Sequence, residues 1–167
     1  MENNKTLDIL KTAILLEKRG KEFYSKVASQ TNIESVKKIF ELMSAEEDIH
    51  IEELSKQYLF YDKNKSFTKN SYISLNNNNV ANFVLSEEMK HQISAASYEA
   101  AAISAAIDME NKAIEAYTKF ANESTDDNEK ELFLWLANWE KDHHHLLHEL
   151  DKQLQEQIWY DNNFWPF

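Results

Sequence analysis

Apolar residues recur every three or four positions along four long stretches of this chain, the spacing of residues that share one face of an α-helix. The stretches cover residues 10–28, 36–54, 103–121 and 132–150. Polar segments with turn and N-cap residues separate the members of each pair, at Thr31-Asn32 and at residues 124–128. The pattern therefore predicts two helical hairpins and an all-α fold.

The two predicted hairpins are copies of one sequence unit. A shift of 93 residues aligns Leu10–Leu54 with Ile103–Leu147 without a gap, and 12 of the 45 aligned positions are identical. A duplicated helical hairpin accounts for this similarity, because most identical positions lie on the faces predicted to be buried. The identical pairs include Ala13/Ala106, Glu17/Glu110, Tyr24/Tyr117, Phe40/Phe133, Glu47/Glu140 and His50/His143.

Residues 60–82 are predicted to be the linker between the hairpins, since they are polar and end in a run of asparagines, Asn76–Asn79. A helix of about 25 residues is about 40 Å long. An extended chain of about 20 residues reaches farther than that. The linker can therefore cross the whole bundle and start the third helix parallel to the second. One such crossover connects ferritin-like four-helix bundles, so we expect residues 1–167 to form a single domain with this fold.

Composition agrees with a helical protein and excludes several kinds of site. Gly20 and Pro166 are the single glycine and the single proline, so residues that break helices are nearly absent. The chain has no cysteine, which excludes disulfides, thiolate zinc sites and cysteine-ligated iron centres. A net charge of −11, without a tight cluster of Lys and Arg, argues against binding to nucleic acid.

The ends of the chain give two further expectations. The longest apolar run near the N-terminus, Ala13–Leu16, is too short for a signal peptide, and no segment has the roughly 20 apolar residues of a membrane span. We therefore expect a cytoplasmic protein with no membrane partner. The aromatic C-terminal tail, residues 158–167, is expected to fold back over apolar bundle surface, with a dimer contact or a docking peptide as alternatives.

Each apolar stripe carries a glutamate at its middle, and two stripes add a histidine three residues later. Side chains three residues apart project from nearly the same helix face. Four carboxylates in a buried core would repel one another and lose their hydration, unless two divalent cations balanced the four negative charges. This pattern of donors is that of di-iron and di-manganese carboxylate bundles. The candidate metal ligands, which are also the candidate catalytic residues, are Glu17, Glu47, His50, Glu110, Glu140 and His143.

The repeat assigns a role to each candidate ligand. Glu47 and Glu140 are expected to bridge two metal ions, because they lie beside the histidines at the centre of the bundle. Glu17 and Glu110 would be terminal ligands, and each histidine would bind one ion. Carboxylate and imidazole donors suit iron, with manganese as the alternative; they suit neither copper(I) nor calcium.

Several neighbouring residues admit two interpretations. Tyr24 and Tyr117 are either plain core residues or hydroxyl donors that hold a carboxylate ligand. Gly20 and Ala113 either leave room above the metals for a small oxidant or allow close helix packing. Glu46, four residues before His50, is the competing ligand to Glu47, but the repeat pairs Glu46 with Trp139 and so favours Glu47. The remaining histidines near the second motif are expected to be solvated or to lie outside the ligand set: His144, His145 and His148.

With these residues in place, the chain resembles the rubrerythrin-like branch of the ferritin-like superfamily. The segments that carry the resemblance are Ile14–Tyr24 and Met109–Tyr117, with Glu46–His50 and Trp139–His143. The resemblance implies a non-haem di-iron centre and frequent dimerisation. Rubrerythrins usually carry a cysteine-containing rubredoxin domain, and they place an extra glutamate where this chain has Ala113. The six-ligand set is closer to that of bacterioferritin.

The resemblance implies an oxidoreductase that reacts with hydrogen peroxide or oxygen. Because the chain has no rubredoxin domain, its electrons would come from a separate partner, and the protein is expected to be a homodimer. Two alternatives stay open: a ferroxidase that handles or stores iron, and a non-catalytic bundle that is stabilised by metal.

Overall fold

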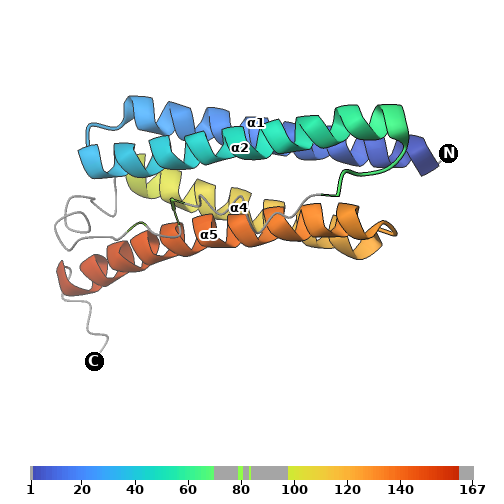
Figure 1. Ribbon diagram of the computed structural model, residues 1–167. Coiled ribbons are helices and arrows are strands. Elements are labelled where there is room, and N and C mark those ends of the chain that lie inside the picture. Colours follow the sequence, from blue (N-terminus) through green and yellow to red (C-terminus); the bar gives the residue numbers. More distant parts are fainter. Residues whose placement is uncertain (1, 70–78, 81–82, 84–97, 162–167) are drawn as a thin grey trace.

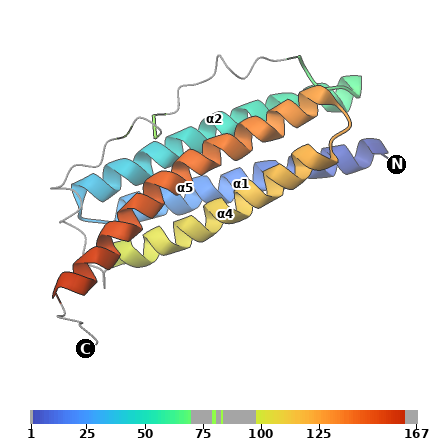
Figure 2. The ribbon, with the colours of Figure 1, turned by 90° about the horizontal axis from the view of Figure 1, so that it is seen from below.

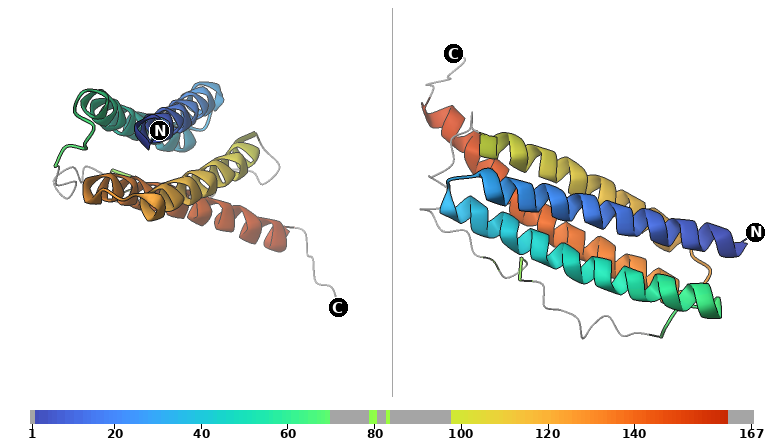
Figure 3. Two further views of the ribbon diagram at one scale, coloured as in Figure 1. Left: turned by 90° about the vertical axis from the view of Figure 1, so that its right-hand side faces the viewer. Right: turned by 90° about the horizontal axis from the view of Figure 1, so that it is seen from above.

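The computed structural model describes residues 2–69, 79–80, 83 and 98–161, and within these ranges it contains four long helices. They are α1 (Glu2–Gln30), α2 (Glu34–Asn64), α4 (Tyr98–Glu123) and α5 (Asp127–Asp161). Helix α1 packs against α2 and helix α4 against α5, so that each predicted hairpin forms one layer (Figure 1). The end-on view in Figure 3 shows the two layers stacked on each other. The predicted all-α four-helix bundle is confirmed.

The direction of the helices agrees with a crossover between the hairpins. Helix α2 ends near the N-terminus of the chain, whereas α4 begins at the opposite end of the bundle (Figures 1 and 2). Helices α2 and α4 are therefore parallel, and the segment between them connects opposite ends of the bundle. This is the connectivity that the ferritin-like prediction requires.

Side-chain hydrogen bonds hold the chain at both predicted turns. The Thr31 hydroxyl accepts a hydrogen bond from the Ile33 backbone N–H at 3.1 Å and donates one to Glu99 at 2.8 Å, which ties this turn to the start of α4. At the second turn, the Asp126 carboxylate accepts hydrogen bonds from the backbone N–H groups of Asn128 (2.7 Å) and Glu129 (3.2 Å). Asp126 is thus the N-cap of α5.

Two segment boundaries differ from the prediction. The linker does not begin at residue 60, because α2 continues to Asn64 and ends at Lys65, whose backbone is left-handed with φ 56°. Tyr61 explains the longer helix, since it is buried and packs against Phe67 with the ring centroids 5.0 Å apart. At the other end, α5 includes the first four residues of the predicted tail, 158–161. The rest of the tail and most of the linker lie outside the described residues, so the predicted contacts of the tail stay predictions.

The hydrophobic core consists of two apolar clusters, one toward each end of the bundle. The first contains Tyr24, Phe40 and Ile103, and the second contains Leu54, Tyr117 and Phe133. Burial of these side chains provides most of the folding energy, at about 25 cal/mol per Å² of apolar surface. Among the helices that the structure describes, none is both long and apolar enough to span a membrane.

Candidate metal centre

Between the two apolar clusters, all four helices bring acidic or imidazole side chains to one buried layer. Helices α1 and α4 each contribute a glutamate, and α2 and α5 each contribute a glutamate and a histidine. Every one of these side chains is at most 3% exposed. The layer contains all six candidate ligands that the sequence predicts: Glu17, Glu47, His50, Glu110, Glu140 and His143.

The six residues form two overlapping sets of four within the described part of the chain. The first set is Glu17, Glu47, His50 and Glu140, and the second is Glu47, Glu110, Glu140 and His143. In each set, one ligand atom from every residue lies within 4.8 Å of the others. Glu47 and Glu140 belong to both sets, which is the arrangement that the sequence predicts for two bridging carboxylates.

Both histidines turn the same ring nitrogen toward the acids. His50 Nδ1 lies 3.1 Å from Glu17 Oε2, 3.2 Å from Glu47 Oε2 and 3.1 Å from Glu140 Oε1. His143 Nδ1 lies 3.1 Å from Glu140 Oε2 and 3.4 Å from Glu110 Oε1. The carboxylates and the two Nδ1 atoms therefore face one common space, as the donors of a metal centre do.

Burial and mutual repulsion shift the proton affinities of the layer strongly. Burial, followed by the charges of Glu140 and Glu17, raises the pKa of Glu47 well above its usual value. Burial and the charge of Glu140 raise the pKa of Glu110 to about 8. Burial would also raise the pKa of Glu140, but His50 and His143 outweigh it, so that this pKa falls below its usual range. Without metal cations, the negative charge of the layer is therefore neutralised only if its side chains bind protons instead.

The histidines show the same compensation. Burial alone would lower the pKa of His50, but the charges of Glu140 and Glu17 outweigh burial and raise it. The pKa of His143 is raised in the same way, because its contacts with the carboxylates of Glu110, Glu140 and Glu46 outweigh burial. A cation between these groups would substitute for the protons on both acids and imidazoles.

A metal ion fits this layer on the evidence of its unsatisfied atoms. Glu140 Oε1 and His143 Nδ1 are fully buried, and neither makes a hydrogen bond of acceptable geometry. Buried polar atoms without partners are rare in native proteins and call for an explanation such as a bound ion. Both atoms lie within the sets described above, so a divalent cation there would supply the missing partner.

Each tyrosine of the repeat reaches across to the carboxylate of the other hairpin. The Tyr24 hydroxyl on α1 donates a hydrogen bond to Glu110 Oε1 on α4, and the Tyr117 hydroxyl on α4 donates one to Glu17 Oε1 on α1. Both rings also pack in the core, Tyr24 near Phe40 and Tyr117 on Phe133. The two interpretations of these tyrosines thus hold together: each is a core residue that also holds one terminal carboxylate.

Glu46, which the sequence offered only as a competing ligand, has a position that sequence reasoning did not predict. The repeat correctly places Glu47 rather than Glu46 in the ligand layer, but Glu46 is itself only 1% exposed. Its Oε2 lies 3.0 Å from His143 Nε2 and accepts a hydrogen bond from Trp139 Nε1 at 2.6 Å. Burial would raise the pKa of Glu46, but these two contacts outweigh it and lower the pKa. Glu46 is thus an ionised carboxylate that contacts His143 at Nε2, on the side of the ring that faces away from the layer.

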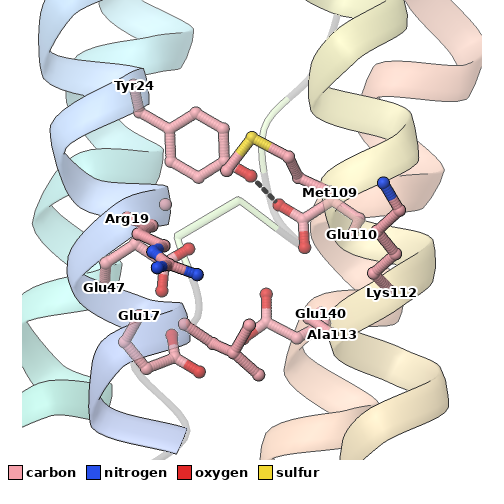
Figure 4. Close-up of a pocket in the computed structure, with 11 residues that line it drawn as sticks. Glu17, Arg19, Tyr24, Glu47, Met109, Glu110, Lys112, Ala113 and Glu140 are labelled. Carbon is pink, nitrogen blue, oxygen red and sulfur yellow. Dashed lines mark hydrogen bonds between the residues drawn. The ribbon is translucent and has the colours of Figure 1, made fainter. Parts of the chain in front are cut away.

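A cavity of about 150 Å³ adjoins the acid layer between α1 and α4. The buried carboxylates of Glu17, Glu47, Glu110 and Glu140 line its inner side, and the exposed side chains of Arg19 and Lys112 lie at its outer side (Figure 4). Gly20 and Ala113 also line the cavity. A Cβ atom at position 20 would stand 3.5 Å from the Glu47 carboxyl group, so a larger side chain there would fill space above this acid.

The other histidines of the second motif lie outside the layer. His145 and His148 are exposed and His144 is half-buried, and the rings of His144 and His148 stack with centroids 5.9 Å apart. None of the three belongs to a metal-ligand group among the described residues.

Four helices in two hairpins, a long crossover and a buried carboxylate–histidine layer define a ferritin-like bundle of the kind that binds metal between its helices. A family model of rubrerythrin matches residues 8–151, so the chain belongs to the rubrerythrin family. Comparison with curated proteins and with solved structures gave no match. Family membership and the buried cluster together indicate a metal site, with iron as the metal that the family suggests.

Proposed function

We propose that this chain is a non-haem di-iron oxidoreductase that reacts with hydrogen peroxide or oxygen. The observation that carries the proposal is the pair of overlapping ligand sets that share Glu47 and Glu140. Two sets with two common carboxylates fit two ions held side by side better than one ion held by six ligands. Four carboxylates would balance the charge of two divalent cations, which removes the repulsion that an empty layer must relieve with protons.

In this proposal each side chain keeps the role that the repeat assigns. Glu47 and Glu140 would contribute to both ion positions, Glu17 and Glu110 to one position each, and His50 and His143 to one position each through Nδ1. Carboxylate and imidazole donors suit iron and manganese alike. Family membership favours iron.

The surrounding residues prepare the site for a small oxidant. When bound, two ferrous ions would supply one electron each to the oxidant. The cavity beside Gly20 and Ala113, of about 150 Å³, has room for a molecule as small as oxygen or hydrogen peroxide, since a water molecule takes about 30 Å³ in the liquid. The apolar clusters on both sides exclude bulk water from the layer. The Tyr24 and Tyr117 hydroxyl groups hold the terminal carboxylates and each carries a proton at an Oε1 atom of the layer.

The rest of the reaction lies outside this chain. Reduction of hydrogen peroxide to two water molecules takes two electrons and two protons, and the cysteine-free chain carries no second redox centre of the thiolate type. We further propose that the electrons come from a separate donor protein and that the protein is a cytoplasmic homodimer.

Ferrous iron as the substrate is the second candidate function. The position at which rubrerythrins carry an extra glutamate is Ala113 here, and Ala113 lines the cavity without adding a carboxylate. A six-ligand site of this composition is the one that resembles bacterioferritin, where iron oxidation is the expected activity.

Stopped-flow mixing of the anaerobic diferrous protein with hydrogen peroxide, and separately with oxygen, tests the proposal. Oxidation that is fast with peroxide supports the peroxidase function. Fast oxidation by oxygen with net uptake of further ferrous iron supports the ferroxidase function. Inertness to both oxidants contradicts an oxidoreductase of either kind and leaves a metal-stabilised bundle.

A further inference from the structure

We propose that the two metal positions of this layer are unequal, and that the position with His143 binds a divalent ion first and more tightly than the position with His50. The two positions look equivalent from the ligands alone, because the repeat supplies the same residue types to both. The difference lies in the hydrogen-bond partner of Nε2, the ring nitrogen of each histidine that faces away from the acids. This inference rests on the proposed metal centre and adds an order of binding to it.

The Glu46 carboxylate contacts the ring of His143 and accepts three further hydrogen bonds. Glu46 Oε2 lies 3.0 Å from His143 Nε2 and 2.6 Å from the indole nitrogen of Trp139. Glu46 Oε1 accepts two backbone hydrogen bonds from the crossover segment, from Asn79 N–H at 2.5 Å and Val80 N–H at 3.0 Å. The four contacts fix the carboxylate, which then fixes the orientation of the His143 ring. They also place the ring proton on Nε2 and leave the Nδ1 lone pair free to face the layer.

His50 has no such support. Its Nδ1 faces the acids as that of His143 does, but its Nε2 is buried and has no hydrogen-bond partner among the described residues. Two indole rings, Trp135 and Trp139, pack nearly perpendicular to the imidazole instead, with centroids 5.5 Å and 5.0 Å away. Within the described part of the chain, no acceptor therefore holds a proton at His50 Nε2 or fixes the ring from the side that faces away from the acids.

The connectivity of the fold explains why the two halves differ at this point. Under the 93-residue shift, the residue that corresponds to Glu46 is Trp139. A buried carboxylate needs several donors to compensate for its lost hydration. At position 46 the crossover provides two of them, the N–H groups of Asn79 and Val80. A chain of two hairpins has a single crossover, so the same two donors are not supplied twice. An indole at position 139 needs no such compensation and donates to Glu46 as well.

The consequence is a difference in metal affinity. A carboxylate that accepts the outer N–H of a histidine ligand fixes its tautomer and makes it a better donor, and removal of such a partner typically costs about 10- to 100-fold in metal affinity. We therefore expect the two stepwise dissociation constants to differ by about this factor, with the tighter ion in the set of Glu47, Glu110, Glu140 and His143.

Anaerobic calorimetric titration of the metal-free full chain with Mn²⁺ tests the inference through a matched pair of variants, His50→Ala and His143→Ala. The two changes remove the same side chain from equivalent positions of the repeat. His50→Ala is expected to retain one tight ion, and His143→Ala one ion bound about 10- to 100-fold more weakly. Equal affinities in the two variants, or the reverse order, would overturn the inference alone. Absence of saturable Mn²⁺ binding to the unsubstituted chain would overturn the proposed metal centre, and the inference with it.

Substitution of Glu46 tests whether this residue causes the difference in metal affinity between the two positions. Glu46→Gln, placed in the His50→Ala background, is expected to weaken the remaining ion about 10-fold. The same change in the His143→Ala background is expected to leave the remaining affinity unaltered, a contrast that a general loss of packing would not produce. Equal losses in both backgrounds would contradict a role through His143. Where a variant does not fold, crystals of the unsubstituted chain with one equivalent of Mn²⁺ decide the order: an anomalous peak beside His143 supports it, and a peak beside His50 overturns it.

Discussion

The apolar ends of the bundle and the acid layer between them are made by the same four stripes, yet their energetics are opposite. At both ends, side chains such as Phe40 and Phe133 are fully buried among other apolar groups. In the layer, six ionisable side chains are buried as completely. Burial stabilises the first kind of region and penalises the second. The bundle therefore folds through its ends and retains the layer for another reason, which we take to be metal.

Residues expected to act on stability and residues expected to act on metal binding lie on the same helix. Within α5, Phe133 belongs to an apolar cluster, whereas Glu140, two turns later, belongs to both ligand sets. A change at the ends should act on folding whether metal is present or not. A change in the layer should act mainly on the metal-loaded protein.

The largest effect on stability is expected for Phe40→Ala and Phe133→Ala, a matched pair in the repeat. Each change leaves a cavity in one apolar cluster and should lower the free energy of unfolding by about 3–5 kcal/mol. The loss, measured by denaturant unfolding, should be the same with and without Mn²⁺. The control is Leu59→Ala, which removes a side chain that is 70% exposed and should change stability by less than about 0.5 kcal/mol. A loss seen only with Mn²⁺ would mean that the apolar ends do not fold independently of the layer.

Glu47→Gln should have the next largest effect, and only in the presence of metal. It removes a bridging carboxylate and should weaken binding at both positions by about 100-fold or more, beyond the loss usual for outer residues. Because burial and neighbouring acids raise the pKa of Glu47, its ionised form is unfavourable in the metal-free layer. The metal-free variant should therefore be as stable as the unsubstituted chain at pH 7. Unfolding of both proteins, with and without Mn²⁺, measures the two effects together, and a large loss in the metal-free state would contradict the account.

The stability of the metal-free protein should fall as pH rises, and the stabilisation that metal adds should grow. In the unfolded chain Glu110 releases its proton near its ordinary pKa of 4.5, whereas in the folded layer it does so at about 8. Between these values the folded state binds more protons, so the free energy of unfolding of the metal-free protein falls as pH rises. The raised pKa values of His50 and His143 act in the same direction.

Glu140 contributes only at low pH, because its pKa is lowered and its stabilisation is lost as pH falls below the ordinary value. Metal binding releases the protons of the layer and so strengthens as pH rises. Thermal unfolding at a series of pH values between about 5 and 8 should show a falling midpoint without Mn²⁺ and a widening gap between the two curves. Parallel curves would show that the layer does not exchange protons for metal.

The smallest effect is expected for Tyr24→Phe and Tyr117→Phe. Each change keeps the ring in its apolar cluster and removes the hydroxyl that holds a terminal carboxylate. Metal affinity should fall about 10-fold, equivalent to about 1.4 kcal/mol, measured by Mn²⁺ titration. Tyr98→Phe is the control, since its hydroxyl bonds to Gln30 far from the layer. If all three variants bound Mn²⁺ equally well, the tyrosines would be core residues alone.

The sequence could predict the helices and the layer because both depend on local periodicity and on an internal repeat. The 93-residue shift pairs Glu17 with Glu110 and Glu47 with Glu140, so each copy supports the interpretation of the other. Glu46 could not be found in this way. Its partners are His143, Trp139 and the crossover residues Asn79 and Val80, all more than 30 positions away in the chain, and the two crossover residues lie outside the repeat.

The boundary of α2 and the partners of the tyrosines also depend on tertiary contacts. Tyr61 extends α2 past the predicted start of the linker because Phe67 packs against it. Tyr24 and Tyr117 each bond to the carboxylate of the other hairpin, and the stripe of a single helix contains no information about that crossing. The signal that would have pointed to Glu46 was the mismatch itself, an acid paired with a tryptophan in a repeat whose six candidate ligand positions agree.

Anomalous diffraction from crystals loaded anaerobically with ferrous iron, recorded on both sides of the iron absorption edge, tests the central claim most directly. Our account predicts a pair of iron peaks in the layer, both in contact with Glu47 and Glu140. A single peak on the protein surface, or side chains of the layer turned toward solvent around water molecules alone, would contradict it.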